Sequence, residues 1–187
     1  MIDGSTLVRD ALVAGIALAG GYAIGSIPVA AWLGRRAGAG ATGAGWRLLT
    51  LTGDLAKGTV PVAIGLVSWS WTAAWVAGMG VVIGACWPAF GRFPGGRGVT
   101  TLGGTAIALA PAAGIIAGLV ALLAAGVARL VQRGAQVPAT AAGLGAWVVL
   151  IAVVEQDLGR LGAALALVLV VGFRIVLGDR SGRAPQP

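Results

Sequence analysis

Residues 99–131 read VTTLGGTAIALAPAAGIIAGLVALLAAGVARLV, and Arg129 is the one charged residue in this run of 33. A continuous helix of that length would measure about 50 Å, well beyond the roughly 30 Å of a bilayer core. Pro111 interrupts the run, because proline lacks a backbone N–H donor and its ring collides with the preceding turn. The run therefore predicts two helices, Val99–Leu109 and a second that ends at Val131. We expect the first, which is short, to be tilted or re-entrant and packed against protein.

The rest of the chain has a similar composition. Its 187 residues are 58% apolar and 10% charged, against about 45 to 50% and about 25% in soluble domains. Five further apolar spans of membrane type are Ala11–Leu33, Leu55–Trp71, Trp75–Phe90, Val137–Val154 and Leu161–Leu177. The expected fold is an all-α, multi-pass membrane helical bundle of about seven transmembrane segments. We expect one domain over residues 1–178 and a short polar C-terminal tail over residues 179–187.

The distribution of cations sets the expected orientation. With seven segments and the N-terminus outside, 11 of the 13 Lys and Arg residues lie inside and only Arg9 and Arg160 lie outside. A six-segment arrangement would divide them 7 to 6, which does not match the excess of Lys and Arg found in cytoplasmic loops. The seven-segment arrangement also places the C-terminus inside.

Several classes of function are excluded by composition. The net charge of +7 is scattered over short loops without a recognisable nucleic-acid-binding module, so no nucleic acid partner is expected. A single cysteine, Cys86, excludes an internal disulfide. The complete absence of histidine excludes His-containing zinc sites and His-based catalytic triads. We expect neither a metal site nor a cofactor.

Three polar segments meet the basic side of this arrangement. They are Gly25-Ser26-Ile27-Pro28, followed nine residues after Ser26 by Arg35; Asp54-Leu55-Ala56-Lys57-Gly58; and Phe93-Pro94-Gly95-Gly96-Arg97-Gly98-Val99-Thr100-Thr101. Asp54 and Lys57 stand three residues apart on one helical face, where charges are costly unless they are paired or used. The alternative is that Asp54 caps the helix while Lys57 extends toward the interface.

The third segment has the composition of an anion-binding turn. A glycine-rich turn that opens a helix exposes backbone N–H groups and the positive end of the helix dipole, and Arg97 adds fixed donors. Lys57, Arg35 and the loop from Gly38 to Gly45 are expected on the same membrane side. Together these features predict a phosphate site at the cytoplasmic interface.

The three segments resemble the bacterial membrane glycerol-3-phosphate acyltransferases that use acyl phosphate as donor, in which similar motifs occur in the same order. The chain departs from the family at several positions. Arg97 replaces a lysine, Ala85 and Phe173 replace histidines, and Val176 replaces an asparagine. The family loop that carries Ser, Asn and Thr reads Gly38-Ala39-Gly40-Ala41-Thr42-Gly43-Ala44-Gly45-Trp46, with the glycines retained.

The resemblance implies synthesis of lysophosphatidic acid from acyl phosphate and glycerol 3-phosphate in the bacterial plasma membrane, in contact with membrane lipids. It implies catalytic roles for Ser26, Lys57 and Arg97, phosphate binding by Arg35, Gly40, Gly43, Gly95, Gly96 and Gly98, and a supporting role for Asp54. The alternative is a non-catalytic membrane protein that binds a phospholipid or a phosphorylated metabolite. The oligomeric state stays open.

Overall fold

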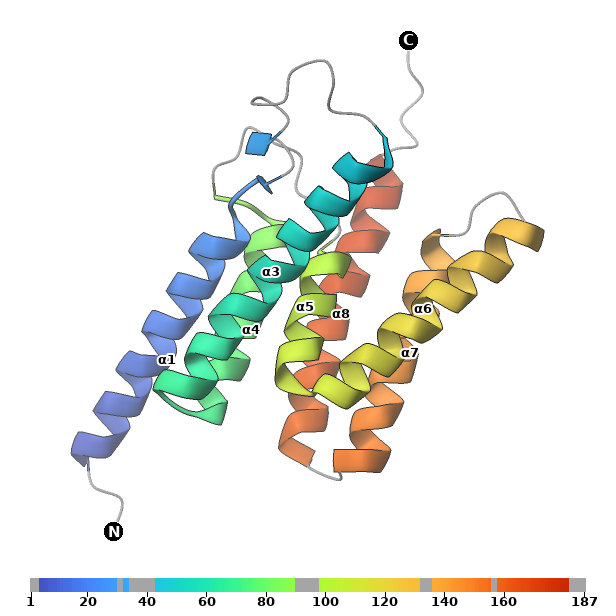
Figure 1. Ribbon diagram of the computed structural model, residues 1–187. Helices are drawn as coiled ribbons and strands as arrows, with labels where there is room; N and C mark the ends of the chain where they lie inside the picture. The colour runs from blue at the N-terminus through green and yellow to red at the C-terminus, as the bar shows by residue number, and fades with distance from the viewer. Residues whose placement is uncertain are drawn as a thin grey trace.

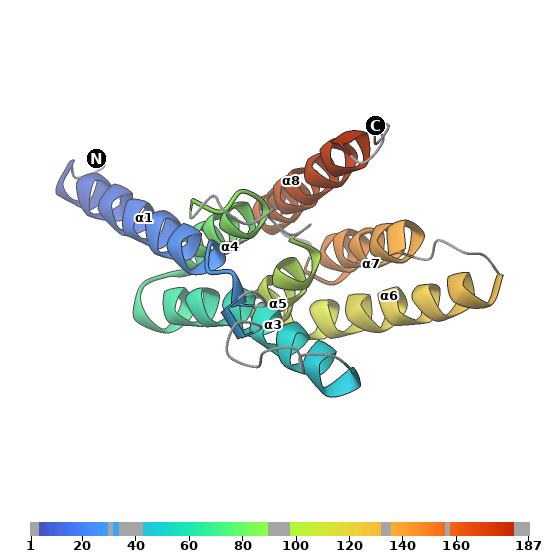
Figure 2. The same ribbon diagram turned by 90° about the horizontal axis from the view of Figure 1, so that it is seen from above.

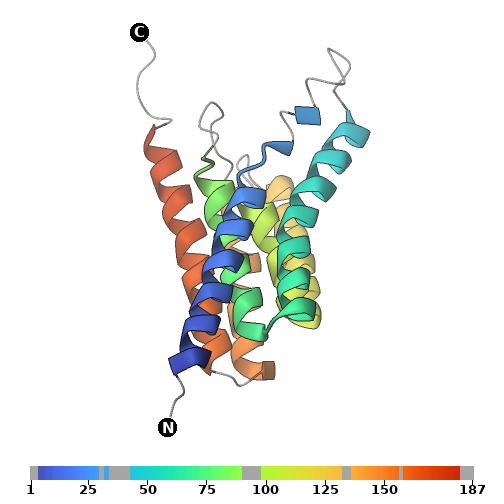
Figure 3. The same cartoon turned by 90° about the vertical axis from the view of Figure 1, so that its left-hand side faces the viewer.

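A computed structural model describes residues 4–29, 32–33, 43–89, 98–131, 136–155 and 158–181. Within these ranges the chain forms seven α-helices that run alternately in opposite directions (Figure 1). The elements are α1 Gly4–Gly25, α3 Ala44–Ser68, α4 Trp71–Cys86, α5 Val99–Leu109, α6 Pro111–Val131, α7 Gln136–Leu150, the π-helical turn η2 Ile151–Glu155, and α8 Leu158–Ser181. The beginning of α1 and the end of α8 lie at opposite ends of the bundle (Figure 3).

The break predicted at Pro111 is confirmed. Helix α5 ends at Leu109, Ala110 lies between the helices, and α6 begins at Pro111. The short α5 is packed against protein as expected, since it contacts α3, α4 and α6. Its buried residues are Thr101, Leu102, Gly104, Thr105, Ala106 and Leu109.

Several boundaries differ from the predicted ones. Helix α1 ends at Gly25 and not at Leu33, because Pro28 lacks a backbone donor and disfavours helical geometry at Ile27. Helix α3 begins at Ala44, 11 residues before the predicted Leu55. Its first turns carry polar residues that lower the apolar content, although the Thr50 and Thr52 hydroxyls donate to carbonyls of the same helix. Helix α8 continues to Ser181, past the predicted start of the tail at residue 179.

Glycines bring two pairs of helices into backbone contact. A Cβ built on Gly21 or Gly25 of α1 would meet the carbonyl of Ala77 or Val81 on α4, and one on Gly80 of α4 would meet the carbonyl of Leu18. In the second pair, Gly58 of α3 lies against α5 and Gly104 of α5 lies against α3. Figure 2 shows α1 beside α4 and α3 beside α5. Close approach at small residues is a common basis of helix association in membranes.

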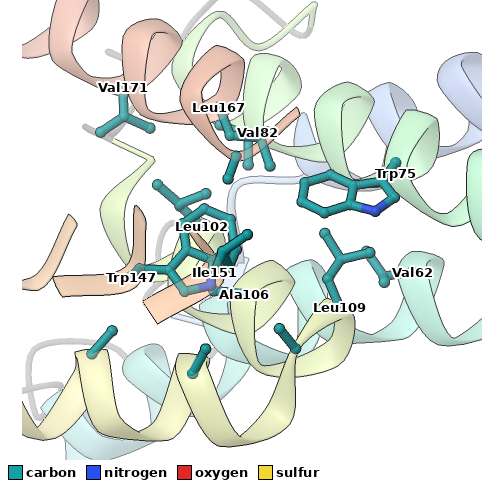
Figure 4. Close-up of a cluster of buried hydrophobic side chains, with 14 of the residues drawn as sticks. Val62, Trp75, Val82, Leu102, Ala106, Leu109, Trp147, Ile151, Leu167 and Val171 are labelled. Atoms are coloured by element: carbon teal, nitrogen blue, oxygen red, sulfur yellow. The ribbon is translucent and has the colours of Figure 1, made fainter. Parts of the chain in front are cut away.

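The core is formed mainly by α4, α5, α7 and α8. Trp147 of α7 is 2% exposed and stacks on Trp75 of α4, with ring centroids 6.4 Å apart. Leu102, Leu109 and Leu167 pack in the same cluster (Figure 4). Trp75 is therefore a core residue.

The outer surface is strongly apolar. Leu122 and Leu123 on α6 are each 70% exposed, and Leu169 on α8 is 71% exposed. Among the described residues, Ser5–Gly25 and Gly159–Val176 are long and apolar enough to cross a membrane, and Trp71–Cys86, Val99–Leu109, Pro111–Val127 and Thr140–Val153 are shorter apolar helices. An apolar exterior of this extent suits contact with lipid and not with water.

Candidate active site

The predicted functional segments meet at one end of the bundle, which we call the motif end. It is the end at which α1, α4 and α8 finish and α3 and α5 begin (Figure 1). Ser26 follows the last residue of α1 and is 1% exposed. Its Oγ accepts a hydrogen bond from the backbone N–H of Ala89, 3.3 Å away, in the turn after α4. The contact joins two segments that are 63 residues apart in the chain.

Asp54 and Lys57 form the predicted pair. Lys57 Nζ lies 2.8 Å from Asp54 Oδ1, and the Lys57 side chain is 12% exposed against 34% for Asp54. The alternative in which Asp54 caps the helix does not apply, because α3 begins ten residues earlier at Ala44. Lys57 Nζ also donates to the backbone carbonyl of Ile27 at 3.1 Å, beside Ser26. The ammonium group thus connects α3 to the turn that follows α1.

Gly98 opens α5 in the way the glycine-rich segment predicts. Its φ of 69° and ψ of 0° place it in the left-handed region. Glycine adopts this conformation without strain because it has no Cβ atom. A Cβ at this position would lie 2.6 Å from Cys86 Sγ, so there is no room here for a residue with a side chain. Gly98 therefore brings the start of α5 against the end of α4.

Gly43 precedes α3 with a φ of 97°, also a conformation that favours glycine. Lys57 lies 14 residues further along the same helix, about 21 Å along its axis. Backbone groups at Gly43 and the ammonium of Lys57 therefore do not adjoin. Of the other predicted phosphate ligands, Arg35, Gly40, Gly95, Gly96 and Arg97 lie outside the described residues.

Two residues that the sequence interpretation did not select hold the turn after α4. Tyr22 Oη donates to the carbonyl of Trp87 at 3.0 Å, and Arg174 Nε donates to the carbonyl of Cys86 at 3.1 Å. Arg174 stands between Phe173 and Val176, the positions at which the resemblance indicates a replaced histidine and a replaced asparagine, and this place in the sequence was the available indication. Tyr22 lies one helical turn before Ser26 and faces the same way, but no pattern in the sequence marks its partner.

The two positions where the family has histidine are apolar here and lie near this turn. Ala85 is the penultimate residue of α4, and Phe173 on α8 places its ring 6.4 Å from the Trp87 ring, at an interplanar angle of 41°. Because the chain has no histidine, no imidazole is available at the motif end to act as a base.

Comparison with known proteins identifies relatives of this chain. Residues 38–178 match the sequence profile described as "Glycerol-3-phosphate acyltransferase". A protein of that name from a Synechococcus species is 36% identical over 152 residues, covering 71% of this chain and 73% of the relative. Another, from Rubrobacter xylanophilus, is 41% identical over 113 residues, covering 51% of this chain and 56% of the relative. The match thus spans little more than half the length of that relative.

Two solved structures share the fold. Both are of PlsY, described as an integral membrane glycerol 3-phosphate acyltransferase, in a glycerol 3-phosphate form and a lysophosphatidic acid form. The first has a TM-score of 0.75 and 22% identity and covers 93% of this chain and 95% of PlsY. The second has a TM-score of 0.73 and 21% identity.

The fold and the apolar exterior define an all-helical integral membrane protein. The sequence matches then identify its family: the chain belongs to the glycerol-3-phosphate acyltransferases.

Proposed function

We propose that this protein transfers an acyl group from acyl phosphate to glycerol 3-phosphate, producing lysophosphatidic acid and inorganic phosphate. The observation that carries the proposal is the position of Lys57, whose ammonium lies between Asp54 and the Ile27 carbonyl next to Ser26. This is a held cation at the end of a glycine-rich helical bundle, in a chain of the acyltransferase family. A cation held in a fixed position is suited to binding the phosphate of either substrate.

The reaction needs no covalent enzyme intermediate. A glycerol hydroxyl oxygen attacks the carbonyl carbon of the acyl phosphate, the bond from that carbon to the phosphate oxygen breaks, and phosphate leaves with the bonding electrons. The hydroxyl proton passes to a phosphate oxygen of one of the substrates. Because the donor is already activated, positioning and charge stabilisation supply much of the rate enhancement.

The residues divide into two roles in this proposal. Lys57, Arg35 and Arg97 bind the two phosphates, and Asp54 orients Lys57. Two of the three donors on the Lys57 ammonium have partners among the described residues, which leaves the third for a substrate oxygen. The glycines at positions 40, 95, 96 and 98 allow close approach of backbone N–H groups, and Gly98 adds the dipole of the N-terminus of α5. Gly43, about 21 Å along α3 from Lys57, is left out of this phosphate site.

The alternative is a protein of the same fold that binds phospholipid or a phosphorylated metabolite without turnover. One observation favours it, namely the replacement of both family histidines by Ala85 and Phe173. Loss of a general base typically costs about 10² to 10⁴-fold in rate, which slows a reaction with an activated donor without abolishing it. We therefore place catalysis first.

We also propose that the bundle lies in the bacterial plasma membrane with α1 entering from outside and the motif end in the cytoplasm. The excess of cations predicted at this end supports the orientation. The motif end would then receive its soluble substrate from the cytoplasm, and the acyl chain would lie between helices next to lipid.

The test uses purified full-length protein in lipid nanodiscs with acyl phosphate and labelled glycerol 3-phosphate, and product is followed as lysophosphatidic acid. We expect product from the wild type and a loss of at least about tenfold in kcat/KM for Lys57→Ala. Arg9→Ala, on the exposed surface of α1 at the opposite end, is the matched loss of one cation and should leave the rate unchanged. Saturable binding of glycerol 3-phosphate without product would select the binding protein instead.

A further inference from the structure

Hydrogen bonds from α1 and α8 fix the turn after α4, and the position of this turn determines the direction in which the Ser26 hydroxyl can form hydrogen bonds. We infer that Tyr22 and Arg174 are positioning residues that orient Ser26 as a hydrogen-bond donor to a substrate oxygen. The inference rests on the proposed function for the identity of the substrate. It adds two residues and a direction of hydrogen bonding that neither the motifs nor the family resemblance assigns.

The first side is α1. Tyr22 and Ser26 are four residues apart and therefore lie on one face of the chain at the end of α1, with Ser26 N–H donating to the Tyr22 carbonyl at 2.9 Å. The Tyr22 hydroxyl donates to the Trp87 carbonyl at 3.0 Å, while Ser26 Oγ accepts from Ala89 N–H at 3.3 Å. Two hydrogen bonds of opposite direction fix the turn against α1, so it cannot rotate about a single contact.

The second side is α8. Arg174 donates from Nε to the carbonyl of Cys86, the last residue of α4. A charged donor makes a stronger hydrogen bond than a neutral one. The adjacent Phe173 ring contacts the Trp87 ring. The turn is therefore attached to α8 immediately before the residues that α1 holds.

The bond from Ala89 defines the polarity of Ser26. A serine hydroxyl has one proton to donate and two lone pairs that accept. The backbone amide of Ala89 occupies a lone pair and withdraws electron density from the oxygen. This strengthens the hydroxyl as a donor and weakens it as a base or nucleophile. Its natural partner is an oxygen that only accepts, such as a phosphate oxygen or the developing oxyanion of the acyl carbonyl.

Packing keeps this geometry rigid. Ser26 is 1% exposed, and a Cβ on Gly84 of α4 would lie 3.1 Å from Ser26 Oγ and 2.9 Å from its backbone nitrogen. The hydroxyl therefore sits against the backbone of α4 in a space with little freedom. A substrate oxygen that meets it would find a donor already oriented, which is the condition for electrostatic preorganisation.

The test is a double-mutant cycle between Tyr22→Phe and Ser26→Ala in nanodiscs, with kcat and KM measured for acyl transfer. Tyr22→Phe removes one hydroxyl and should lower kcat about three- to tenfold with little change in KM for glycerol 3-phosphate. In the Ser26→Ala background the same change should alter kcat by less than about twofold, because its effect passes through Ser26. Thr52→Val removes an exposed hydroxyl that bonds only to carbonyls of its own helix in the described structure, and serves as the control with no expected change.

Arg174 provides an independent arm. Arg174→Lys should retain more activity than Arg174→Met, because a lysine can still donate to the Cys86 carbonyl, and both effects should shrink in the Ser26→Ala background. If Tyr22→Phe lowers the rate equally in both backgrounds, or lowers only the melting temperature, the residues are structural and the inference is wrong. It is also wrong if Ser26→Ala changes nothing.

The cycle does not depend on turnover. The affinity for glycerol 3-phosphate, measured by titration calorimetry on the same variants, is read in parallel. A wild type that binds but does not turn over would reject the proposed acyl transfer, while coupling between Tyr22 and Ser26 in the affinities would still support the positioning role. A wild type that turns over with no coupling in either measurement would reject the positioning role alone.

Discussion

Lys57 donates from Nζ to the main-chain carbonyl of Ile27 at 3.1 Å, and the same nitrogen lies 2.8 Å from Asp54 Oδ1. One ammonium thus joins a carboxylate on its own helix to the turn after another helix, 30 residues earlier in the chain. The charge is partly buried, so its partners determine where it points. This relationship gives the first prediction.

Asp54→Asn should raise KM for glycerol 3-phosphate several-fold and lower stability by about 1 kcal/mol, the range of a partly exposed ion pair. The amide keeps the size of the carboxylate but leaves Lys57 without its counter-charge. Steady-state kinetics and the melting temperature check both effects. Asp10→Asn, on the exposed surface of α1 at the opposite end, is the matched control. Equal effects of the two substitutions would show that only net charge matters.

Gly98→Ala should destabilise the protein by about 1 to 3 kcal/mol, because alanine at a φ of 69° is strained and its Cβ would lie 2.6 Å from Cys86 Sγ. Gly118→Ala in α6 has no atom within 4 Å of the new Cβ and should be neutral or slightly stabilising. Thermal unfolding in detergent measures both. Adding Cys86→Ala removes the sulfur and should return part of the loss, and no recovery at all would assign the cost to backbone strain alone.

Two adjacent glycines on α5 should respond differently to alanine. Gly104→Ala places a Cβ on the backbone carbonyl of Leu55 in α3, so the helices must separate, and we expect a loss of about 2 kcal/mol or more together with reduced activity. Gly103→Ala meets Leu55 Cδ2 at 3.6 Å, an ordinary contact, and should be tolerated. The unfolding midpoints of Gly104→Ala and Gly103→Ala measure the difference in stability. Similar losses in both would mean that helix propensity and not packing is being measured.

Orientation in the membrane can be read by labelling single cysteines in a Cys86→Ala background. Ser5→Cys at the start of α1 should react with a membrane-impermeant maleimide in intact spheroplasts, whereas Gly45→Cys at the start of α3 should react only after lysis. Both positions are exposed. The reverse pattern would place the motif end outside, which is incompatible with a cytoplasmic substrate.

The pH dependence of the rate should belong to the substrate. With no histidine in the chain, the proposed proton acceptor is a phosphate dianion, which is lost as the pH falls through its second pKa of about 6. We therefore expect kcat/KM to rise with pH and level off above about pH 7. A phosphonate analogue of glycerol 3-phosphate, with a higher second pKa, should move the rising limb upward. A limb that stays in place would assign the base to the protein.

Features governed by local chemistry were predictable from the sequence, and features governed by distant partners were not. Pro111 marked a helix break because proline acts on its own backbone, and the spacing of Asp54 and Lys57 placed both on one helical face. The family resemblance, carried by three short motifs, was confirmed. The start of α3 was missed because hydropathy does not detect an exposed polar helical turn.

The contact between Tyr22 and Trp87 joins residues 65 positions apart. The sequence around neither residue indicates that the two are in contact. The Ile27 carbonyl could not be anticipated as a partner of Lys57 for the same reason, since every residue has such a carbonyl. In each case tertiary packing decided between options that the sequence left equal.

The glycine contacts between α1 and α4 make the position of the Ser26 hydroxyl depend on residues that have no functional side chain. What faces Gly21, Gly25 and Gly80 is main chain, so a neighbour cannot turn away to admit a methyl group. Any such substitution would push α1 and α4 apart. The displacement would change the distance between Ser26 Oγ and the backbone N–H of Ala89 at the end of the two helices. The geometry of the site thus depends on glycines that lie next to Ser26 or within about two helical turns of it and that carry no functional side chain.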